Sequence, residues 1–174
     1  NLYVASIFGS NLPVDFDPSG GVLELTGTDI DSDIALAKYT PEGKVLWAIA
    51  LKGPGPDVVY SAALNASGTS IYIAGTYSQT LDFDPTSNGD VRTASALRDL
   101  FVAKYSTLDG SLEWANSMGG TGIDVAFDLA VDTQDAVFVS GVYQSVVDFD
   151  ASSSGNISLT TAGGFDNFLA SYNG

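Results

Sequence analysis

The sequence contains no cysteine and no histidine, and each absence removes a class of chemistry. Without cysteine the chain has neither a disulfide framework nor a thiolate metal site. Without histidine it lacks the most common general base, the usual transition-metal ligand and every Ser-His-Asp arrangement. The remaining residues do not suggest a positioned nucleophile with its base, so we predict that the protein is not an enzyme.

Basic residues are scarce, because six Lys and Arg stand against 21 Asp and Glu, for a formal net charge of -15. Nucleic acid and anionic membrane surfaces are bound through basic patches, so neither is expected as a partner. No apolar run approaches the roughly 18 residues of a membrane-spanning helix, and no membrane insertion is expected. The chain begins at Asn1 without a Met, which indicates a processed chain or part of a longer one.

A unit of about 66 or 67 residues recurs along the chain, and it is the strongest signal in the sequence. A fixed period of this kind means that one supersecondary unit is used repeatedly. Three landmarks share this spacing: an acidic strand (VDFDP at 14–18, LDFDP at 81–85 and VDFDA at 147–151), an apolar run (IALAKY at 34–39, LFVAKY at 100–105 and NFLASY at 167–172) and a tryptophan (Trp47 and Trp114).

Short apolar stretches rich in Val, Ile, Phe and Tyr alternate with turn residues, a pattern typical of strands. The second repeat predicts strands at 60–64, 70–77, 99–106 and 111–117, with a short extra strand at 80–84. Turns that contain Asp-Gly, Glu-Gly or Ser-Gly suit tight antiparallel hairpins, because glycine accepts positive φ. A four-stranded antiparallel sheet that recurs along a chain is the blade of a β-propeller.

The phase of the repeat leaves both end blades unfinished, since the chain begins on a second strand and ends on a third one. We therefore predict an all-β fold of tandem four-stranded antiparallel propeller-like blades, with about 2.6 repeats and incomplete end blades. Because propellers close with four or more blades, completion by other repeats or by neighbouring subunits in a head-to-tail, even filamentous, assembly is expected. The predicted units are a partial blade at 1–56, a complete blade at 57–122 and a partial blade at 123–174.

Six short motifs follow one another in order along the unit. The motifs are D-x-F-V-A-K-Y, L-x-W-A, G-G-x-G-x-D, a hydrophobic strand ending in V-D, V-Y-V-x-G (here with Phe in place of Tyr) and V-D-F-D, at 99–105, 112–115, 119–124, 126–132, 137–141 and 147–150. This order resembles the bacterial SBBP-type β-propeller repeat family. The resemblance implies an extracellular protein, secreted or attached to the bacterial surface, without a known catalytic apparatus. The chain departs from the pattern at Ala151 for Pro, at Ser171 for Lys and at KGPGP (52–56) for the Gly-Gly loop.

The acidic strand is the best candidate for a binding site. Side chains alternate along a strand, so Asp82 and Asp84 share one face. Neighbouring carboxylates repel unless a positive or donating group stands between them. Calcium prefers several oxygen ligands, and loop carbonyls or Asn88 could complete its shell. The candidate calcium ligands are the paired aspartates of the three units: Asp15, Asp17, Asp82, Asp84, Asp148 and Asp150.

The alternative is that these aspartates cap turns, accept backbone N–H bonds or pair with Lys38 and Lys104 on the neighbouring strand. Ser171 replaces the lysine in the third unit, which would make Asp148 and Asp150 the better metal site. A second acidic cluster, DIDSD at 29–33, lacks the Gly and distal Glu of an EF-hand loop.

Two further sets of recurring residues have a structural and a functional interpretation. Asp33, Asp99 and Asp166 precede the apolar strand, where a hydrogen bond from loop to strand is more common than a ligand role. Trp47 and Trp114 could form a sugar-stacking platform, but packing between blades is the more common use of a recurring tryptophan.

Together these observations predict a non-enzymatic, extracellular structural or adhesive propeller module whose partners are proteins, with glycans as further candidates. The alternative is a calcium-dependent carbohydrate- or peptide-binding propeller domain. A glycosidase or lyase would need two carboxylates that flank a cleft, for which Asp82 and Asp84 are the nearest candidates.

Overall fold

The computed structural model describes residues 1–9, 11–28, 31–87, 89–152 and 155–173, which form strands, turns and loops. Within these ranges no helix is present, and none is therefore long and apolar enough to cross a membrane. The described residues form these strands: β1 (Leu2–Phe8), β2 (Val14–Asp15), β3 (Glu24–Leu25), β4 (Asp33–Tyr39), β5 (Val45–Leu51), β6 (Val58–Leu64), β7 (Ser70–Tyr77), β8 (Thr80–Asp82), β9 (Val91–Thr93), β10 (Asp99–Ser106), β11 (Leu112–Met118), β12 (Val125–Val131), β13 (Val137–Asp148) and β14 (Ser158–Tyr172).

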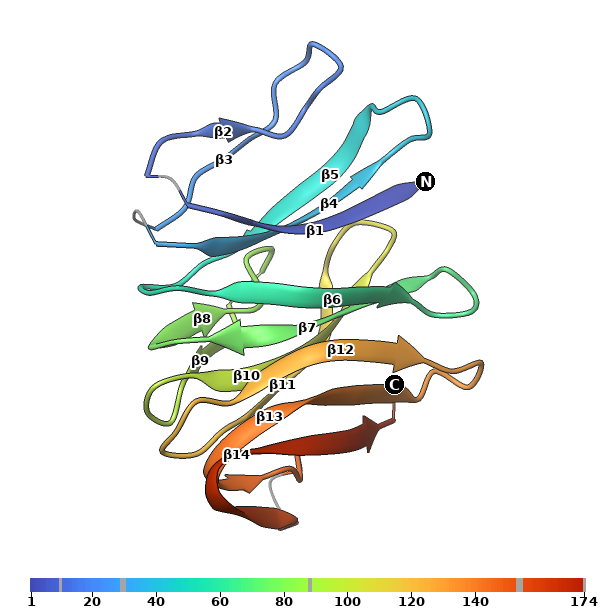
Figure 1. Cartoon of the computed structure of the whole chain (residues 1–174). Helices are drawn as coiled ribbons and strands as arrows, with labels where there is room; N and C mark the ends of the chain where they lie inside the picture. The colour runs from blue at the N-terminus through green and yellow to red at the C-terminus, as the bar shows by residue number, and fades with distance from the viewer. Residues whose placement is uncertain (10, 29–30, 88, 153–154, 174) are drawn as a thin grey trace.

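The long strands form three antiparallel sheets that follow one another along the chain. The first sheet has the order β1-β4-β5, the second β11-β10-β7-β6 and the third β12-β13-β14. The short pairs β2-β3 and β8-β9 form separate hairpins. The sheets are stacked from the N-terminal to the C-terminal one (Figure 1). The prediction of an all-β fold of four-stranded antiparallel blades with incomplete ends is confirmed.

Among the described strands the second sheet has all four of a blade, whereas the first and third sheets each lack a different one. In the second sheet, β6, β7, β10 and β11 are neighbours in the order of the sequence. The repeat spacing makes β1, β4 and β5 the counterparts of β7, β10 and β11, so the first sheet lacks a counterpart of β6. The same spacing makes β12, β13 and β14 the counterparts of β6, β7 and β10, so the third sheet lacks a counterpart of β11.

The second sheet is covered on both faces, which explains the continuous burial of its central strands. Alternation along β10 directs Phe101 and Tyr105 toward the first sheet and Leu100 and Val102 toward the third. The turn between β6 and β7 has Gly68 at φ 69°, where a glycine is favoured.

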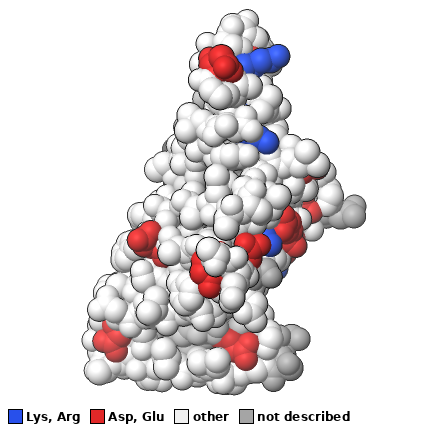
Figure 2. All heavy atoms as spheres, turned by 90° about the vertical axis from the view of Figure 1, so that its right-hand side faces the viewer, with Lys and Arg blue, Asp and Glu red and all other residues white. Residues whose placement is uncertain are grey.

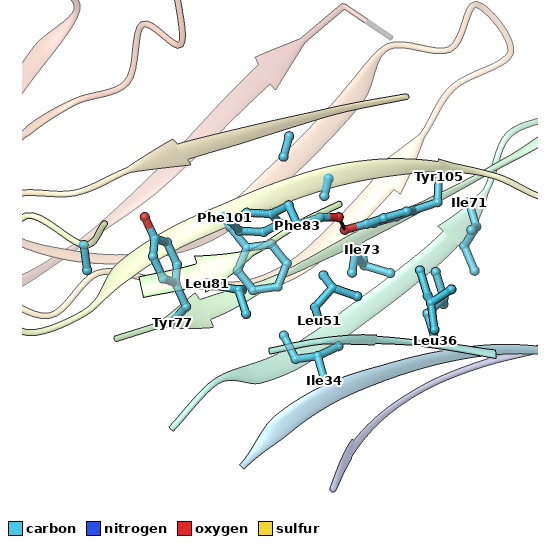
Figure 3. Packing of buried hydrophobic residues seen from close by; sticks show 14 residues of the cluster. Ile34, Leu36, Leu51, Ile71, Ile73, Tyr77, Leu81, Phe83, Phe101 and Tyr105 are labelled. Carbon is cyan, nitrogen blue, oxygen red and sulfur yellow. Dashed lines mark hydrogen bonds between the residues drawn. The ribbon is translucent and has the colours of Figure 1, made fainter. Parts of the chain in front are cut away.

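The core consists of two apolar layers, one on each side of the second sheet. The layer between the first and second sheets is shown in Figure 3, where Ile34, Leu36 and Leu51 lie against the residues of the second sheet. The hairpin β8-β9 adds Leu81 and, just after β8, Phe83 to the same layer. The second layer joins the second and third sheets through Leu100, Val102, Met118, Val137, Val139, Val147, Phe149 and Phe168.

The strands of the second repeat agree closely with those predicted from the sequence. β7 and β10 have the predicted bounds, and β6 starts two residues before the predicted 60–64. The third unit differs, because its acidic strand continues β13 and pairs with the start of β14 after a register shift between Gln144 and Val146.

Equivalent leucines in the first and third sheets provide a test of this packing. Leu36 is fully buried between two sheets, whereas Leu169, at the equivalent place in the third sheet, is 76% exposed. We expect Leu36→Ala to lower the free energy of unfolding by about 2–5 kcal/mol, because it leaves a cavity. Leu169→Ala should change it by less than about 0.5 kcal/mol. Urea unfolding followed by tryptophan fluorescence measures both, and equal losses would contradict the stacked arrangement.

Candidate functional site: acidic hairpins and open sheet edges

The first aspartate of each acidic pair closes a hairpin through the backbone. In the second unit, Asp82 Oδ1 accepts the N–H of Asp84 and the N–H of Asp90, both at 3.0 Å. In the first unit, Asp15 Oδ1 accepts the N–H groups of Asp17 and Leu23 at 2.9 Å. The third unit repeats the arrangement, with Asp148 Oδ1 bonded to the N–H of Asp150 at 3.0 Å and of Ile157 at 2.8 Å.

The second aspartate of each pair forms a local turn. Asp17 Oδ1 accepts both the N–H and the hydroxyl of Ser19, at 2.8 and 2.6 Å. Asp84 accepts hydroxyls from Thr86 and Ser87, and Asp150 accepts the N–H of Ser152 at 2.8 Å. Hydrogen bonds from these serine hydroxyls hold the pKa values of Asp17, Asp84 and Asp150 below their ordinary value.

A tyrosine from the neighbouring strand holds each acidic hairpin in place, a role that the sequence did not reveal. The hydroxyl of Tyr105 donates to the backbone carbonyl of Phe83 at 2.9 Å, and the Phe83 ring is buried in the core. Burial raises the pKa of Tyr105 well above its usual range. The equivalent bonds join Tyr39 to the carbonyl of Phe16 at 3.0 Å and Tyr172 to that of Phe149 at 3.2 Å.

The lysines on the neighbouring strands bind elsewhere. Lys38 Nζ donates to the backbone carbonyl of Thr107 in the second unit. Lys104 Nζ forms an ion pair with Glu113 at 3.1 Å. Neither contact involves the acidic hairpin. That Ser171 makes Asp148 and Asp150 the better metal site stays a prediction.

Calcium binding at the acidic hairpins stays a prediction. Each carboxylate already accepts N–H or hydroxyl hydrogens, as the turn-forming alternative expects. The described residues contain no group of three or more His, Cys, Asp or Glu that could hold a metal ion. Asn88, and Asp29 and Ile30 of the DIDSD cluster, lie outside the described residues. Figure 2 shows carboxylates dispersed over one face of the molecule, with few basic side chains among them.

The aspartates before the apolar strands bond to local backbone, as expected from the sequence. Asp33 Oδ2 accepts the N–H of Thr28 at 2.7 Å, and Asp99 Oδ2 accepts that of Ser95 at 3.0 Å. Asp166 Oδ2 accepts the N–H of Ala162 at 3.2 Å. These bonds fix the corner at which each loop enters its strand.

Asp99 and Asp124 form a buried acidic pair where the second and third sheets join. Asp124 accepts the N–H of Gly120 at 2.8 Å and the N–H of Gln144 at 2.9 Å, which ties the G-G-x-G-x-D loop to β13. Burial raises the pKa of both carboxyls, and the charge of Asp124 raises that of Asp99 further. Oδ1 of Asp99 is buried and has no hydrogen-bond partner within the described part of the chain.

The KGPGP segment (52–56), which replaces the Gly-Gly loop in the first unit, keeps the close glycine contact and the aspartate hydrogen bond of the G-G-x-G-x-D loop. A Cβ at Gly120 would lie 2.1 Å from the carbonyl oxygen of Val146, and one at Gly53 would lie 1.7 Å from that of Thr80. Glycine is therefore required at both positions for the loop to approach the adjacent strand. Asp57 Oδ1 accepts the N–H of Ser78, which corresponds to the bond from Gln144 to Asp124.

The tryptophans pack between sheets. Trp47 Nε1 donates to the carbonyl of Thr107 in the second unit at 3.3 Å, and its ring lies against the core between the first and second sheets. The Trp114 ring meets Tyr72 edge-on at 5.9 Å and packs against the core between the second and third sheets. The packing interpretation is thus confirmed for both residues.

β1 and β14 are edge strands of the two end sheets, whereas their counterparts in the second sheet, β7 and β10, are paired on both sides. β1 pairs only with β4, and β14 pairs only with β13 among the described strands. Edge strands of this kind present N–H and C=O groups to other chains. The outward face of the third sheet is also apolar, since Phe138 and Leu169 are exposed there. Their second-sheet equivalents, Tyr72 and Val102, are fully buried.

Comparison with known proteins agrees with this geometry. No protein-family model matches the chain. The chain is 28% identical over 138 residues to an uncharacterized WD repeat-containing protein of Acanthamoeba polyphaga mimivirus; the match covers 76% of this chain and 10% of that protein. It is 29% identical over 154 residues to the regulatory protein FlaEY of Caulobacter vibrioides; this match covers 87% of the chain and 15% of that protein.

The class that the fold and these similarities indicate is a β-propeller-like repeat protein. The chain spans only a small part of the curated relatives that it matches, 10% and 15% of their lengths. Membership of the SBBP family in particular stays a prediction.

The buried acidic pair predicts a pH dependence of stability. The pKa of Asp99 is raised on folding, so its carboxyl contributes stability that is present below the unfolded pKa, near 3.8, and is lost as the pH rises through the folded pKa. The stability of the wild type relative to Asp99→Asn should therefore be greater at about pH 3 than at about pH 7.

Asp109→Asn is the matched control, because the hydrogen bond from the Ser111 hydroxyl lowers the pKa of Asp109. The stability that Asp109 contributes is present above its unfolded pKa and lost as the pH falls through its folded pKa. The stability of the wild type relative to Asp109→Asn should therefore be greater at about pH 7 than at about pH 3. Urea unfolding of the three proteins at both pH values measures this. The same sign for both variants would contradict the assignment.

Proposed function

We propose that the chain is a non-enzymatic structural or adhesive module of an extracellular β-propeller protein, which joins its unfinished sheets to other repeats or to neighbouring subunits. The observation that carries the proposal is the change in burial along the repeat. Leu36 and Val102 are fully buried beneath the following sheet, whereas Leu169 is exposed. A further sheet on this face would bury Leu169 and Phe138 as the third sheet buries Val102 and Tyr72.

The unpaired sides of β1 and β14 support the same proposal. Strand addition at a sheet edge supplies backbone hydrogen bonds, while side chains on the adjoining faces select the partner. Other propeller repeats of a longer protein or a second subunit would provide both the missing strand and the missing face. The similarity to a WD repeat-containing protein agrees with the use of the chain beside further repeats.

The roles of the acidic residues support a non-enzymatic module. Asp82 and Asp84, the nearest candidates for glycoside hydrolysis, accept hydrogen bonds that close a hairpin. Extracellular location and adhesion rest on the resemblance to SBBP repeats and on the net charge of -15, which suits a cation-rich medium.

Association through the third sheet is tested with Leu169→Lys. We expect the wild-type chain to form dimers or larger assemblies in native mass spectrometry at micromolar concentration. The charge on the outward apolar face should shift these species to monomer by at least about tenfold, because a lysine ammonium resists burial. Leu108→Lys, on a turn where Leu108 is 81% exposed, should leave association unchanged. A wild-type chain that stays a folded monomer throughout would contradict the proposal.

The competing proposal is a calcium-dependent carbohydrate- or peptide-binding propeller, in which the acidic hairpins bind the metal. For the structural module we expect no saturable heat on calorimetric titration with calcium, and the same melting temperature in calcium and in chelator. A saturable heat that is lost in Asp82→Asn would favour the calcium-dependent domain instead.

A further inference from the structure

β6 and β12 occupy equivalent places at one edge of the second and third sheets, and they share an unusual shape. We call this first strand of a blade its inner strand, and the fourth strand, β11 in the second sheet, its outer strand. Each contains a β-bulge at the equivalent place, between Val59 and Ser61 in β6 and between Ala126 and Asp128 in β12. The bulged residues are Tyr60 and Phe127, whose rings meet edge-on at 5.4 Å. A bulge re-aims a side chain and bends its strand toward the partner.

Each bulged strand approaches a glycine on the neighbouring strand. A Cβ at Gly75 would lie 2.0 Å from the carbonyl oxygen of Val58, and a Cβ at Gly141 would lie 1.9 Å from that of Val125. Both obstacles are backbone atoms, which cannot turn away as a flexible side chain can. The bulged inner strand therefore requires glycine at this position.

The rings of Phe101 and Phe168, on the other neighbouring strand, also leave no room for a Cβ at Gly75 and Gly141. Phe101 is paired in register with Gly75, and its ring would lie 2.8 Å from a Cβ there. Phe168 is paired with Gly141 at the same distance.

The first sheet has neither the glycine nor the phenylalanine that the second and third sheets have at these paired positions. Its residue at the glycine position is Ser6, and its residue at the phenylalanine position is Ala35, which is paired with Ser6 in register. The Cβ of Ser6 occupies the space that the carbonyl of a bulged inner strand would need. The β1 edge is therefore shaped differently from the β7 and β13 edges, to which β6 and β12 bind.

A hollow marks where an added strand would lie. A cavity of about 340 Å³ opens between β1 and β6, lined by Asn1, Tyr3, Ala62, Leu64 and Ile71 among others. The equivalent place between β7 and β12 is filled by β6, which pairs with β7 and packs on β12, where Ser61 Oγ donates to Asp128 Oδ1 at 2.8 Å. An inner strand on β1 would pack on β6 in the same way.

We propose that the β1 edge binds a regular antiparallel strand with apolar side chains and no bulge opposite Ser6. This strand comes from a polypeptide segment unlike β6 and β12, so the inner strands of a second copy do not fit. The inference rests on the proposed function, since it specifies the partner at one of its open edges.

Three fluorescent peptides test the proposal by anisotropy with the full chain. The first has the sequence of residues 57–65, the second carries Tyr60→Ala, and the third lacks residue 60 and so has no bulge. The wild-type chain should bind the third peptide at least about tenfold more tightly than the other two, a factor that corresponds to roughly 1.4 kcal/mol. The second peptide separates the effect of the aromatic ring from that of the extra residue.

Variants of the edge locate the effect. Ser6→Gly removes the Cβ and should raise the affinity for the first peptide at least about tenfold, whereas Ser6→Ala keeps the Cβ and should behave as the wild type. Ile7→Lys should abolish binding of the third peptide, while Leu169→Lys should not. Circular dichroism confirms that each variant is folded.

Equal binding of all three peptides, or preference of the wild type for the bulged one, would overturn the proposal. Absence of binding to every variant would also overturn it. Association of the chain through Leu169 would still hold in that case, so the proposed function and the nature of the β1 partner fail separately.

Discussion

Every sheet of this repeat has two apolar faces, and covering both of them is the constraint on which the rest of the structure depends. β10 shows the constraint most directly, because alternate side chains of one strand belong to two different core layers. A sheet built in this way buries both apolar faces only between two others. The described chain meets this condition once, in the second sheet, and leaves an apolar face open on the third.

The polar groups of the repeat hold the hairpins and loops in place between the stacked sheets. The acidic pairs shape hairpins, two of which carry Phe83 and Phe149 into the core layers, and a tyrosine hydroxyl holds each of the three hairpins by its backbone. Asp124 ties the loop after β11 to β13 in the next sheet. A network of this kind explains why so many aspartates recur at fixed places, although the described residues contain no group of three or more His, Cys, Asp or Glu that could hold a metal ion.

The sequence predicted the strands well, because their signal is local. Alternation and turn glycines fixed β7 and β10 at their observed bounds. The tyrosine bonds were missed, since each joins a side chain to a backbone carbonyl 22 or 23 residues away. Ser6 was missed for a related reason: a serine in place of a glycine matters only once the distance from its Cβ position to a neighbouring carbonyl is known.

The two end sheets of the stack lack different strands, and this difference limits how copies of the chain can associate. The first sheet lacks an inner strand, and the third lacks an outer one. Within the described chain every strand of either kind is already paired in its own sheet, so a second copy has none to donate without opening itself. Copies that keep their own sheets intact therefore meet edge to edge or face to face, whereas a further repeat or a different subunit could supply a missing strand. Ser6 also restricts the shape of the strand that can pair with β1, because its Cβ leaves no room for a bulged strand of the kind that pairs with β7 and β13.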